Sequence, residues 1–504
     1  MAAASIVSVA INTGGCHRSP DIQVLSESTR IAQSQPSPAD SAVFDGKAVY
    51  LRGVRGETLG LQLRISDGQS RSASLTLPES AALVSSFSVQ SLVVSEPSTD
   101  MYGPSSGAGV YPDVLVPADG ATVQSNDLAF FDVAIAPLSP AGRYQGKLKI
   151  DERVVPVFLE VGRGRIDLRS NPLVWVSYAP EEIARTTGLP DGDGPQLIAK
   201  EEEYDALFRA HGAYLASDLL PTRFAARRRM VHNVTYWPVA VDTTSDEAIE
   251  QDVKRWLELF QGTGVTPFTI AVDEPKTAAR KERARHIAEV MGRAGGGRPR
   301  LLRGVTDVAS PFYGDTIDLF IAPGNIPRFS LARAARGEHF WTYNGRPPQA
   351  GSMIVDTDGA ALRTWGWIAE RYGIELWYAW EGLYFSDRNN QGGPTDLIHQ
   401  PITFDERRKG GSDWGNGDGV LAYPGPLPSL RLKMLRRGLQ DRLLLRELAA
   451  CGGVKVGQDI MHRTVPRALA EAGEVPAWPA TAAAWERAHG EVLDAIETWC
   501  NDVP

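Results

Sequence analysis

Residues 268–277 read FTIAVDEPKT, a short apolar run that ends on two adjacent acids, Asp273 and Glu274, and then on a proline. A run of this length with β-branched residues is typical of a buried strand. Pro275 disfavours helical geometry at the residue before it, so the end of the strand should stay extended. We therefore predict a strand that ends at the acid pair, followed by a helix over residues 276–290.

The same alternation of short apolar runs and amphipathic stretches fills the chain after residue 162. Residues 244–247 (TSDE) form a capping box at a predicted helix start, and residues 295–297 (GGG) mark a helix end. Repeated strand–helix units predict the α/β class with a parallel sheet. Because the units are many and no dinucleotide-type glycine fingerprint is present, we predict a (β/α)8 TIM-type barrel with C-terminal helices over residues 163–504. A doubly wound open sheet is the alternative.

The preceding region has a different pattern. Residues 46–162 carry period-2 alternation and β-rich runs, separated by clusters of Gly, Pro, Asp and Ser. No segment there has a helical period, so we predict an antiparallel β-sandwich domain before the barrel. Asp151 and Glu152 are interpreted as the turn of a hairpin in this domain.

The composition is that of an ordinary globular protein. The chain has 504 residues, 43% of them hydrophobic and 22% charged, which is enough for two domains. A net charge of −9 without a basic block argues against a nucleic-acid partner. Three cysteines do not make a disulfide framework, and whether Cys451 and Cys500 meet is left open.

Residues 1–45 are predicted to be a leader and a polar tether. Cys16 follows an apolar stretch and small residues (residues 4–16, ASIVSVAINTGGC), and a polar segment comes after it. This order resembles a bacterial lipoprotein leader, which implies export and a lipid anchor at Cys16. The stretch departs from that pattern, because no Lys or Arg precedes it and Thr13 replaces the usual leucine. A cytoplasmic protein with a frayed N-terminus or a wrongly assigned start codon is the alternative.

The acid pair is the candidate catalytic feature. Asp-Glu dipeptides occur four times, but only Asp273-Glu274 ends an apolar run in the strand–helix region. In barrels that edge carries the catalytic residues. Neighbouring side chains of a regular strand point to opposite faces, so both acids serve one site only if the backbone twists or bulges there. We predict that it does; the alternative is one acid in the site and one paired with a lysine or arginine.

Two carboxyl groups at one edge indicate glycoside hydrolysis, in which one donates a proton and the other stabilises the cationic transition state. Flat amphipathic rings near later strand ends suit the apolar faces of sugars. These rings are Trp341, Tyr343, Trp377, Tyr378, Trp380 and Tyr384, whereas Trp365 and Trp367 are assigned to the core. The eight histidines show no spacing typical of metal ligands, and the sequence has neither a Walker motif nor a GxSxG motif. We therefore expect neither a metal nor a cofactor.

Four segments carry a resemblance to a known family. They are residues 341–348 (WTYNGRPP), 362–375 (LRTWGWIAERYGIE), 376–385 (LWYAWEGLYF) and 415–448, which begin GNGDGVLAYPG and continue into an arginine-bearing helix. Together with VDEP at residues 272–275, they resemble bacterial glycoside hydrolases related to family 123, the β-N-acetylgalactosaminidases. The resemblance extends over residues 46–448 and is strongest over residues 340–448.

The resemblance implies an exo-acting, retaining enzyme that releases terminal β-linked N-acetylgalactosamine by substrate-assisted catalysis. Glu274 would be the general acid/base. Asp273 would orient the 2-acetamido group and stabilise an oxazolinium-like intermediate, so the enzyme supplies no nucleophile. The substrate would be a carbohydrate with a terminal N-acetylhexosamine, and the galacto configuration rests on the resemblance alone. For such an acid, with the charge of Asp273 close by, we expect a raised pKa at Glu274.

The resemblance also implies roles for substrate-binding residues. Tyr343 would hydrogen-bond the acetamido oxygen, and Trp341 and Trp380 would be sugar-stacking walls. Asn416 and Asp418 would bind hydroxyls, although a turn in GNGDG is an equal interpretation. The remaining candidates are Tyr384 and Glu381.

Two features depart from the family pattern. Residues 379–382 read AWEG, whereas the family is expected to have Trp followed directly by Gly. Glu381 is therefore an additional substrate ligand or an acid that competes with the pair. The polar insertion at residues 386–417 has no counterpart in the family.

Two other functions stay open. One is a glycosidase that pairs Glu274 with Glu381, Asp358 or Asp318 and acts on a sugar without an acetamido group. The other is a non-catalytic carbohydrate-binding protein.

Overall fold

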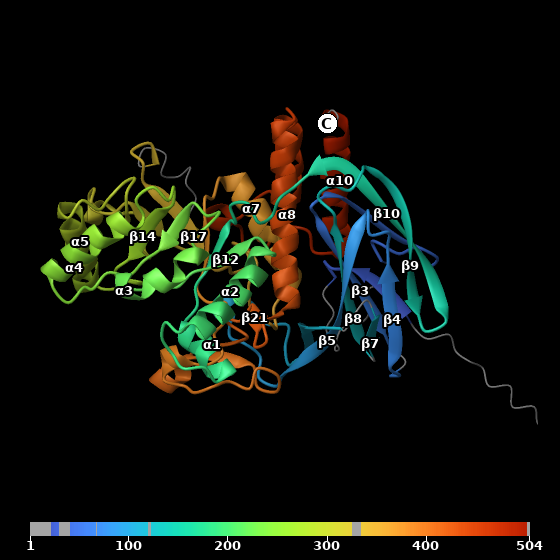
Figure 1. The fold of residues 1–504 in the computed structure, drawn as a ribbon, viewed down its shortest axis with the longest axis horizontal. Helices are drawn as coiled ribbons and strands as arrows, with labels where there is room; N and C mark the ends of the chain where they lie inside the picture. The colour runs from blue at the N-terminus through green and yellow to red at the C-terminus, as the bar shows by residue number, and fades with distance from the viewer. Residues whose placement is uncertain are drawn as a thin grey trace, which may run out of the picture.

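The computed structural model describes residues 22–29, 41–66, 68–118, 122–125, 127–324 and 334–500. A β-sandwich and a parallel sheet with its helices lie on opposite sides of the long helix α8 (Leu430–Ala450) (Figure 1). The predicted lipid-anchor residue Cys16 lies outside the described residues.

The sandwich consists of two five-stranded sheets, with strand orders β1-β3-β8-β5-β6 and β2-β10-β9-β4-β7. All pairs are antiparallel except β10 and β2, which are parallel. Asp151 and Glu152 join β9 to β10 as the predicted hairpin turn. The strands are β1 (Ile22–Ser26), β2 (Val49–Arg55), β3 (Thr58–Ile65), β4 (Arg71–Thr76), β5 (Ala82–Val94), β6 (Gly109–Pro117), β7 (Thr122–Ser125), β8 (Leu128–Ile135), β9 (Gly142–Ile150) and β10 (Arg153–Arg165).

Strand β1 corrects one expectation about the N-terminal region. Residues 1–45 were predicted to be leader and tether, but Ile22–Ser26 pair antiparallel with β3 at the edge of the sandwich. Val24 and Leu25 are 1% and 2% exposed, so this short apolar segment is part of the sandwich. The sequence around this segment is polar, so the strand cannot be recognised from its neighbours in sequence; it becomes visible only when β3 pairs with it.

The second part of the chain contains an eight-stranded, all-parallel sheet, as predicted. Its order is β12-β11-β18-β17-β16-β15-β14-β13, so the first strand pairs with the last and the sheet curls as in a TIM-type barrel. In the described part of the chain no ladder joins β12 to β13; the Tyr214 hydroxyl donates to the Tyr236 carbonyl there at 2.8 Å. The strands are β11 (Val174–Val176), β12 (Ala213–Leu215), β13 (Tyr236–Pro238), β14 (Thr266–Ile270), β15 (Leu302–Val305), β16 (Leu319–Ile321), β17 (His339–Tyr343) and β18 (Trp377–Ala379).

Helices connect these strands and complete the C-terminal region. Ser245 caps α4 by accepting from the Ala248 amide, as the capping box predicts, and Thr277 caps α5 in the same way through Arg280. The α-helices besides α8 are α1 (Pro180–Thr187), α2 (Pro195–Arg209), α3 (Pro221–Phe224), α4 (Asp246–Leu259), α5 (Ala278–Arg293), α7 (Thr364–Tyr372), α9 (Val454–Thr464) and α10 (Ala482–Trp499). The 3₁₀ helices are η1 (Asp100–Tyr102), η2 (Ala225–Met230), η3 (Pro311–Tyr313), η5 (Gly359–Arg363), η6 (Arg388–Asn390), η7 (Glu406–Lys409) and η8 (Leu469–Glu471).

The insertion at residues 386–417 is folded rather than an open loop. It contains η6, η7 and a two-stranded antiparallel sheet of β19 (Ile402–Asp405) and β20 (Trp414–Asn416). A second small hairpin follows, made of β21 (Ala422–Tyr423) and β22 (Leu427–Pro428). Trp365 and Trp367 are fully buried, which confirms their assignment to the core.

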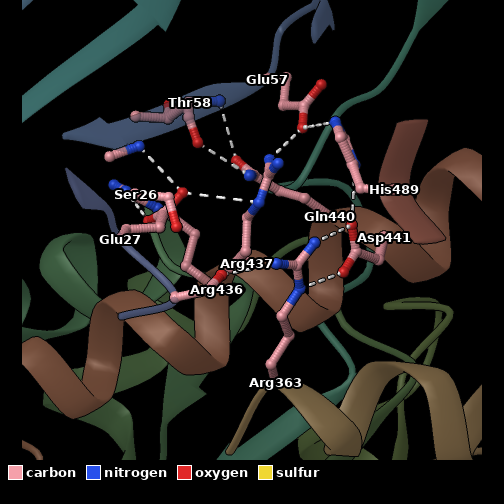
Figure 2. Close-up of polar contacts among 12 residues, drawn as sticks. Ser26, Glu27, Glu57, Thr58, Arg363, Arg436, Arg437, Gln440, Asp441 and His489 are labelled. Atoms are coloured by element: carbon pink, nitrogen blue, oxygen red, sulfur yellow. Dashed lines mark hydrogen bonds and ion pairs between the residues drawn. The ribbon is translucent and has the colours of Figure 1, made fainter. Parts of the chain in front are cut away.

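Helix α8 carries charged side chains into the junction between the sandwich and the sheet (Figure 2). Arg436 pairs with Glu27 of the sandwich at 3.2 Å, and Arg437 pairs with Glu57. Asp441 pairs with Arg363, ahead of α7, at 2.6 Å and accepts from a ring nitrogen of His489 on α10 at 3.0 Å. Buried charges are stable only when they are paired in this way. The network therefore joins three parts of the chain through α8.

Near the junction, α8 and α10 are also joined covalently. Cys451 and Cys500 form a disulfide with an S–S distance of 2.08 Å, which answers the question left open by the sequence. Glu447 lies beside them, but the disulfide occupies both sulfurs of this potential ligand group. Among the described residues, no helix combines the length and apolar character needed to cross a membrane.

Candidate active site

Asp273 and Glu274 lie in a bend directly after β14, at the carboxyl edge of the parallel sheet. Glu274 has φ of +39°, an unusual value for a residue other than glycine. Its amide donates to Thr306 Oγ1 at 2.5 Å, and the same hydroxyl donates to Asp273 Oδ1 at 2.7 Å. Because the backbone leaves strand geometry here, the alternation of side chains no longer separates the two acids.

The carboxylate of Glu274 has two partners. Tyr343, the last residue of β17, donates its hydroxyl to Oε1 at 2.9 Å. The ammonium of Lys276 lies 2.9 Å from Oε2. Burial raises the pKa of Glu274, but the hydrogen bonds from Lys276 and Tyr343 outweigh it, so the pKa lies below its usual value. The expected raised pKa is therefore wrong for the free protein, because the sequence did not place Lys276 against this carboxylate.

The charges of both acids act on the hydroxyl of Tyr343. Burial raises the pKa of Tyr343 strongly, and the charges of Glu274 and Asp273 both raise it further. Burial likewise raises the pKa of Tyr378, and Glu381 and Asp273 add to the effect. The rings of Tyr343 and Tyr378 lie 6.1 Å apart on neighbouring strands. Asp273 and Glu274 therefore lie within electrostatic reach of one cluster of tyrosines at the sheet edge.

A cavity of about 340 Å³ lies beside Tyr343. A larger cavity, of about 680 Å³, lies at the amino end of β14 and so at the far end of this strand from the acids. We assign the site to the smaller cavity because one of its lining residues, Tyr343, hydrogen-bonds Glu274; the two acids lie behind Tyr343 and do not themselves line the cavity. The smaller cavity is lined by Met101, Tyr102, Pro323, Gly324, Thr342, Tyr343, Asn344, Gly345, Arg346, Gln349, Ala350 and Leu469.

Trp380, directly after β18, is half-buried near the same edge. Its backbone amide donates to Asn344 Oδ1 at 3.1 Å, and its indole N–H donates to Asp418 Oδ1 at 2.9 Å. Asp418 is 1% exposed, and burial raises its pKa to about 7. In this structure Asp418 is closed off from the surface and orients the indole of Trp380, and its hydroxyl-binding role stays a prediction.

Three other predicted substrate-binding residues are buried. Trp341 is fully buried and packs against Phe268 with ring centroids 4.9 Å apart, so it fills the interior of the sheet instead of forming a sugar wall. Tyr384 is fully buried behind Trp380, with its hydroxyl bonded within the insertion. Asn416 is 1% exposed and donates to the Glu96 carbonyl at 2.9 Å. A strand-end or turn position does not by itself bring a side chain to the surface.

The acids proposed as rival partners of Glu274 are all engaged with other groups. Glu381 is 7% exposed and paired with Arg388, and burial raises its pKa to about 8. Asp318 is fully buried at the amino end of β16 and pairs with Arg303 at 2.6 Å. Asp358 caps η5. Asp318 and Asp358 are held in structural roles, whereas Glu381 acts with Asp273 on the pKa of Tyr378, so a conventional pair with Glu381 stays the alternative.

The sequence missed four residues of this site. Thr306 and Asn344 each directly follow a strand of the parallel sheet, β15 and β17, so the strand-end rule applied to Asp273 also covers them. Lys276 is close to the pair in sequence, but its contact with Glu274 depends on the bend. Tyr102 comes from the sandwich, and no local pattern connects it to the sheet.

Comparison with known proteins identifies the fold. No family model and no curated protein matches the sequence. A solved structure of a family 123 glycoside hydrolase from Clostridium perfringens is similar over 95% of this chain and 98% of its own, with a TM-score of 0.65 and 11% identity. A GH10 xylanase with a bacterial Ig-like domain from termite gut covers 62% of this chain and 90% of its own at 9% identity, but its TM-score of 0.22 supports no conclusion.

The chain thus has the fold of a family 123 glycoside hydrolase, a β-sandwich followed by a curled parallel eight-stranded sheet. This confirms, at the level of the fold, the resemblance found in the sequence.

Proposed function

We propose that the protein is an exo-acting, retaining glycoside hydrolase that releases terminal β-linked N-acetylgalactosamine by substrate-assisted catalysis. The observation that carries the proposal is the bend that places Asp273 and Glu274 beside Tyr343, on a fold shared with a family 123 enzyme. That enzyme is described as acting on glycolipid glycans.

In the proposed first step, the substrate's acetamido oxygen attacks the anomeric carbon while Glu274 gives its proton to the departing oxygen. Asp273 holds the acetamido N–H and stabilises the positive charge of the oxazolinium ring. In the second step, Glu274 takes a proton from water, which attacks the anomeric carbon and restores the acetamide. Tyr343 turns from Glu274 to the acetamido oxygen when the sugar binds.

Lys276 is the group that keeps Glu274 ionised before substrate binds. Its side chain is 81% exposed, so an entering sugar can displace it from the carboxylate. Loss of the ammonium and of water then raises the pKa of Glu274 toward that of a proton donor.

Replacing Lys276 with methionine should therefore raise the pKa of Glu274 in the free enzyme. The group must be protonated to act as the acid, so the alkaline limb of the pH profile of kcat/KM should move to higher pH. Lys254→Met is the matched control, because Lys254 is exposed on α4 and pairs only loosely with Glu250 at 3.9 Å. An alkaline limb at the same pH in Lys276→Met and wild type contradicts this role for Lys276.

The proposed function is tested with chromogenic β-N-acetylgalactosaminide, β-N-acetylglucosaminide and β-galactoside assayed side by side. We expect cleavage of the N-acetylgalactosaminide with retention of configuration. Cleavage of the galactoside alone rules out substrate assistance. Glycan binding without any turnover, unchanged in Glu274→Gln, indicates the non-catalytic alternative.

We also propose that the protein is exported and anchored by lipid at Cys16. The Cys451–Cys500 disulfide supports export, because disulfides persist in oxidising compartments and are rare in the cytosol of most organisms. Mass spectrometry of the native protein, with and without Cys16→Ser, tests the anchor. A native protein that begins before Cys16 and carries no lipid contradicts it.

A further inference from the structure

We propose that Tyr102, on the β-sandwich, is a substrate-binding residue of the site and donates a hydrogen bond to an oxygen of the bound sugar. The inference rests on the proposed function and adds a residue from the other domain. Tyr102 ends η1, in the connection between β5 and β6, and it lines the cavity that also contains Tyr343.

The loop that carries Tyr102 is held firmly on the parallel-sheet part of the chain. The carboxylate of Asp356, which is fully buried, accepts from the Ser98 amide at 2.8 Å and from its hydroxyl at 2.6 Å. The Asp356 carbonyl accepts from the Ser106 amide at 2.6 Å. A Cβ added at Gly103 would lie 2.8 Å from the ring of Pro347, so the loop packs closely against this proline. Tyr102 is thus a fixed part of the cavity wall.

The Tyr102 hydroxyl belongs to a chain of hydrogen bonds that runs through Asn344 to the backbone of Trp380. It accepts from Asn344 Nδ2 at 3.1 Å, and Asn344 Oδ1 in turn accepts from the Trp380 amide at 3.1 Å. No described residue accepts the hydroxyl's own hydrogen, although Asn344 fixes the position of its oxygen. Because an ordered O–H without an acceptor at a cavity wall favours a neutral oxygen ligand, a sugar oxygen suits it.

The charges of nearby acids also act on the hydroxyl. Burial raises the pKa of Tyr102 well above its usual value, and Asp418, Tyr343 and Glu274 raise it further. The phenol therefore stays protonated and can donate across the working pH range. Tyr343, at the end of β17, and Tyr102, on the sandwich, line one cavity, and Tyr343 links it to Glu274 through a hydrogen bond of 2.9 Å. The site is complete only when the two domains are joined, as they are by the charged network of α8.

The test is Tyr102→Phe, which keeps the ring and removes only the hydroxyl. A neutral hydrogen bond present in both the bound and the transition state should change KM, so we expect a rise of roughly 3- to 10-fold with kcat nearly unchanged. Tyr144→Phe is the matched control, since its hydroxyl donates to the Pro140 carbonyl on a remote hairpin of the sandwich. An unchanged KM in Tyr102→Phe overturns the inference.

A second readout separates this inference from the proposed function. If the wild type cleaves none of the three glycosides, the proposed function fails by itself. Binding of N-acetylgalactosamine, followed by quenching of tryptophan fluorescence, then decides the inference. An affinity about 3- to 10-fold weaker in Tyr102→Phe than in wild type supports it. Equal affinities, or no binding by the wild type, overturn it.

Discussion

Glu274→Gln should lower kcat/KM by about 10²- to 10⁴-fold on glycosides whose leaving group is a sugar or an alkyl alcohol. A poor leaving group needs a proton as its bond breaks, and glutamine has none to give. An activated aryl glycoside departs without that proton, so its rate should fall far less. The measurement is kcat/KM for both classes of glycoside, because it reports the step in which the leaving group departs and not the later step in which Glu274 acts as a base. Wild type and variant are purified in parallel.

Two comparisons make this result specific. Asp273→Asn should be severe for both leaving groups, about 10²- to 10³-fold, because Asp273 acts at the acetamido side and not at the departing oxygen. Glu152→Gln is the matched control, since Glu152 is the exposed acid of another Asp-Glu pair, in the turn between β9 and β10. If Glu274→Gln slows both leaving groups equally, Glu274 is not the proton donor.

Asp441→Ala should lower the free energy of unfolding by about 3–5 kcal/mol. Asp441 is fully buried on α8, where it pairs with Arg363 and accepts from the indole of Trp367 at 2.8 Å and from His489. Burial raises its pKa, but Arg363 and His489 outweigh this and hold it far below the usual range. Alanine leaves the buried guanidinium of Arg363 without this partner. Urea unfolding followed by circular dichroism measures the loss.

Controls separate the lost ion pair from the lost charge alone. Asp459→Ala removes an exposed carboxylate that pairs with Lys455 at 3.2 Å on α9, and its effect should stay below about 1 kcal/mol. A double variant, Arg363→Met with Asp441→Leu, removes both buried charges and should be less destabilised than Asp441→Ala. A loss in Asp441→Ala no greater than in the Asp459 control means that the network does not stabilise the junction.

Local patterns in the sequence were sufficient for the architecture. Period-2 alternation before residue 162 and strand–helix alternation after it predicted the sandwich and the parallel sheet, because each signal comes from residues adjacent along the chain. The strand-end rule directed attention to Asp273 and Glu274, since the carboxyl ends of parallel strands meet at one edge. The capped start of α4 and the buried Trp365 and Trp367 are local in the same sense.

The tertiary structure alone decided which of these residues are exposed and what they contact. Trp341, Tyr384, Asn416 and Asp418 carry the same local signals as Tyr343, yet they are buried by distant segments. The lowered pKa of Glu274 depends on a bend that brings Lys276 to its carboxylate, and Tyr102 reaches the cavity from the sandwich. Burial and charge are set by neighbours far along the chain, whereas periodicity is set by neighbours next to each other. The sequence by itself therefore determined the elements and the candidate catalytic edge, and only the packing of the two domains determined the contacts of the candidate site.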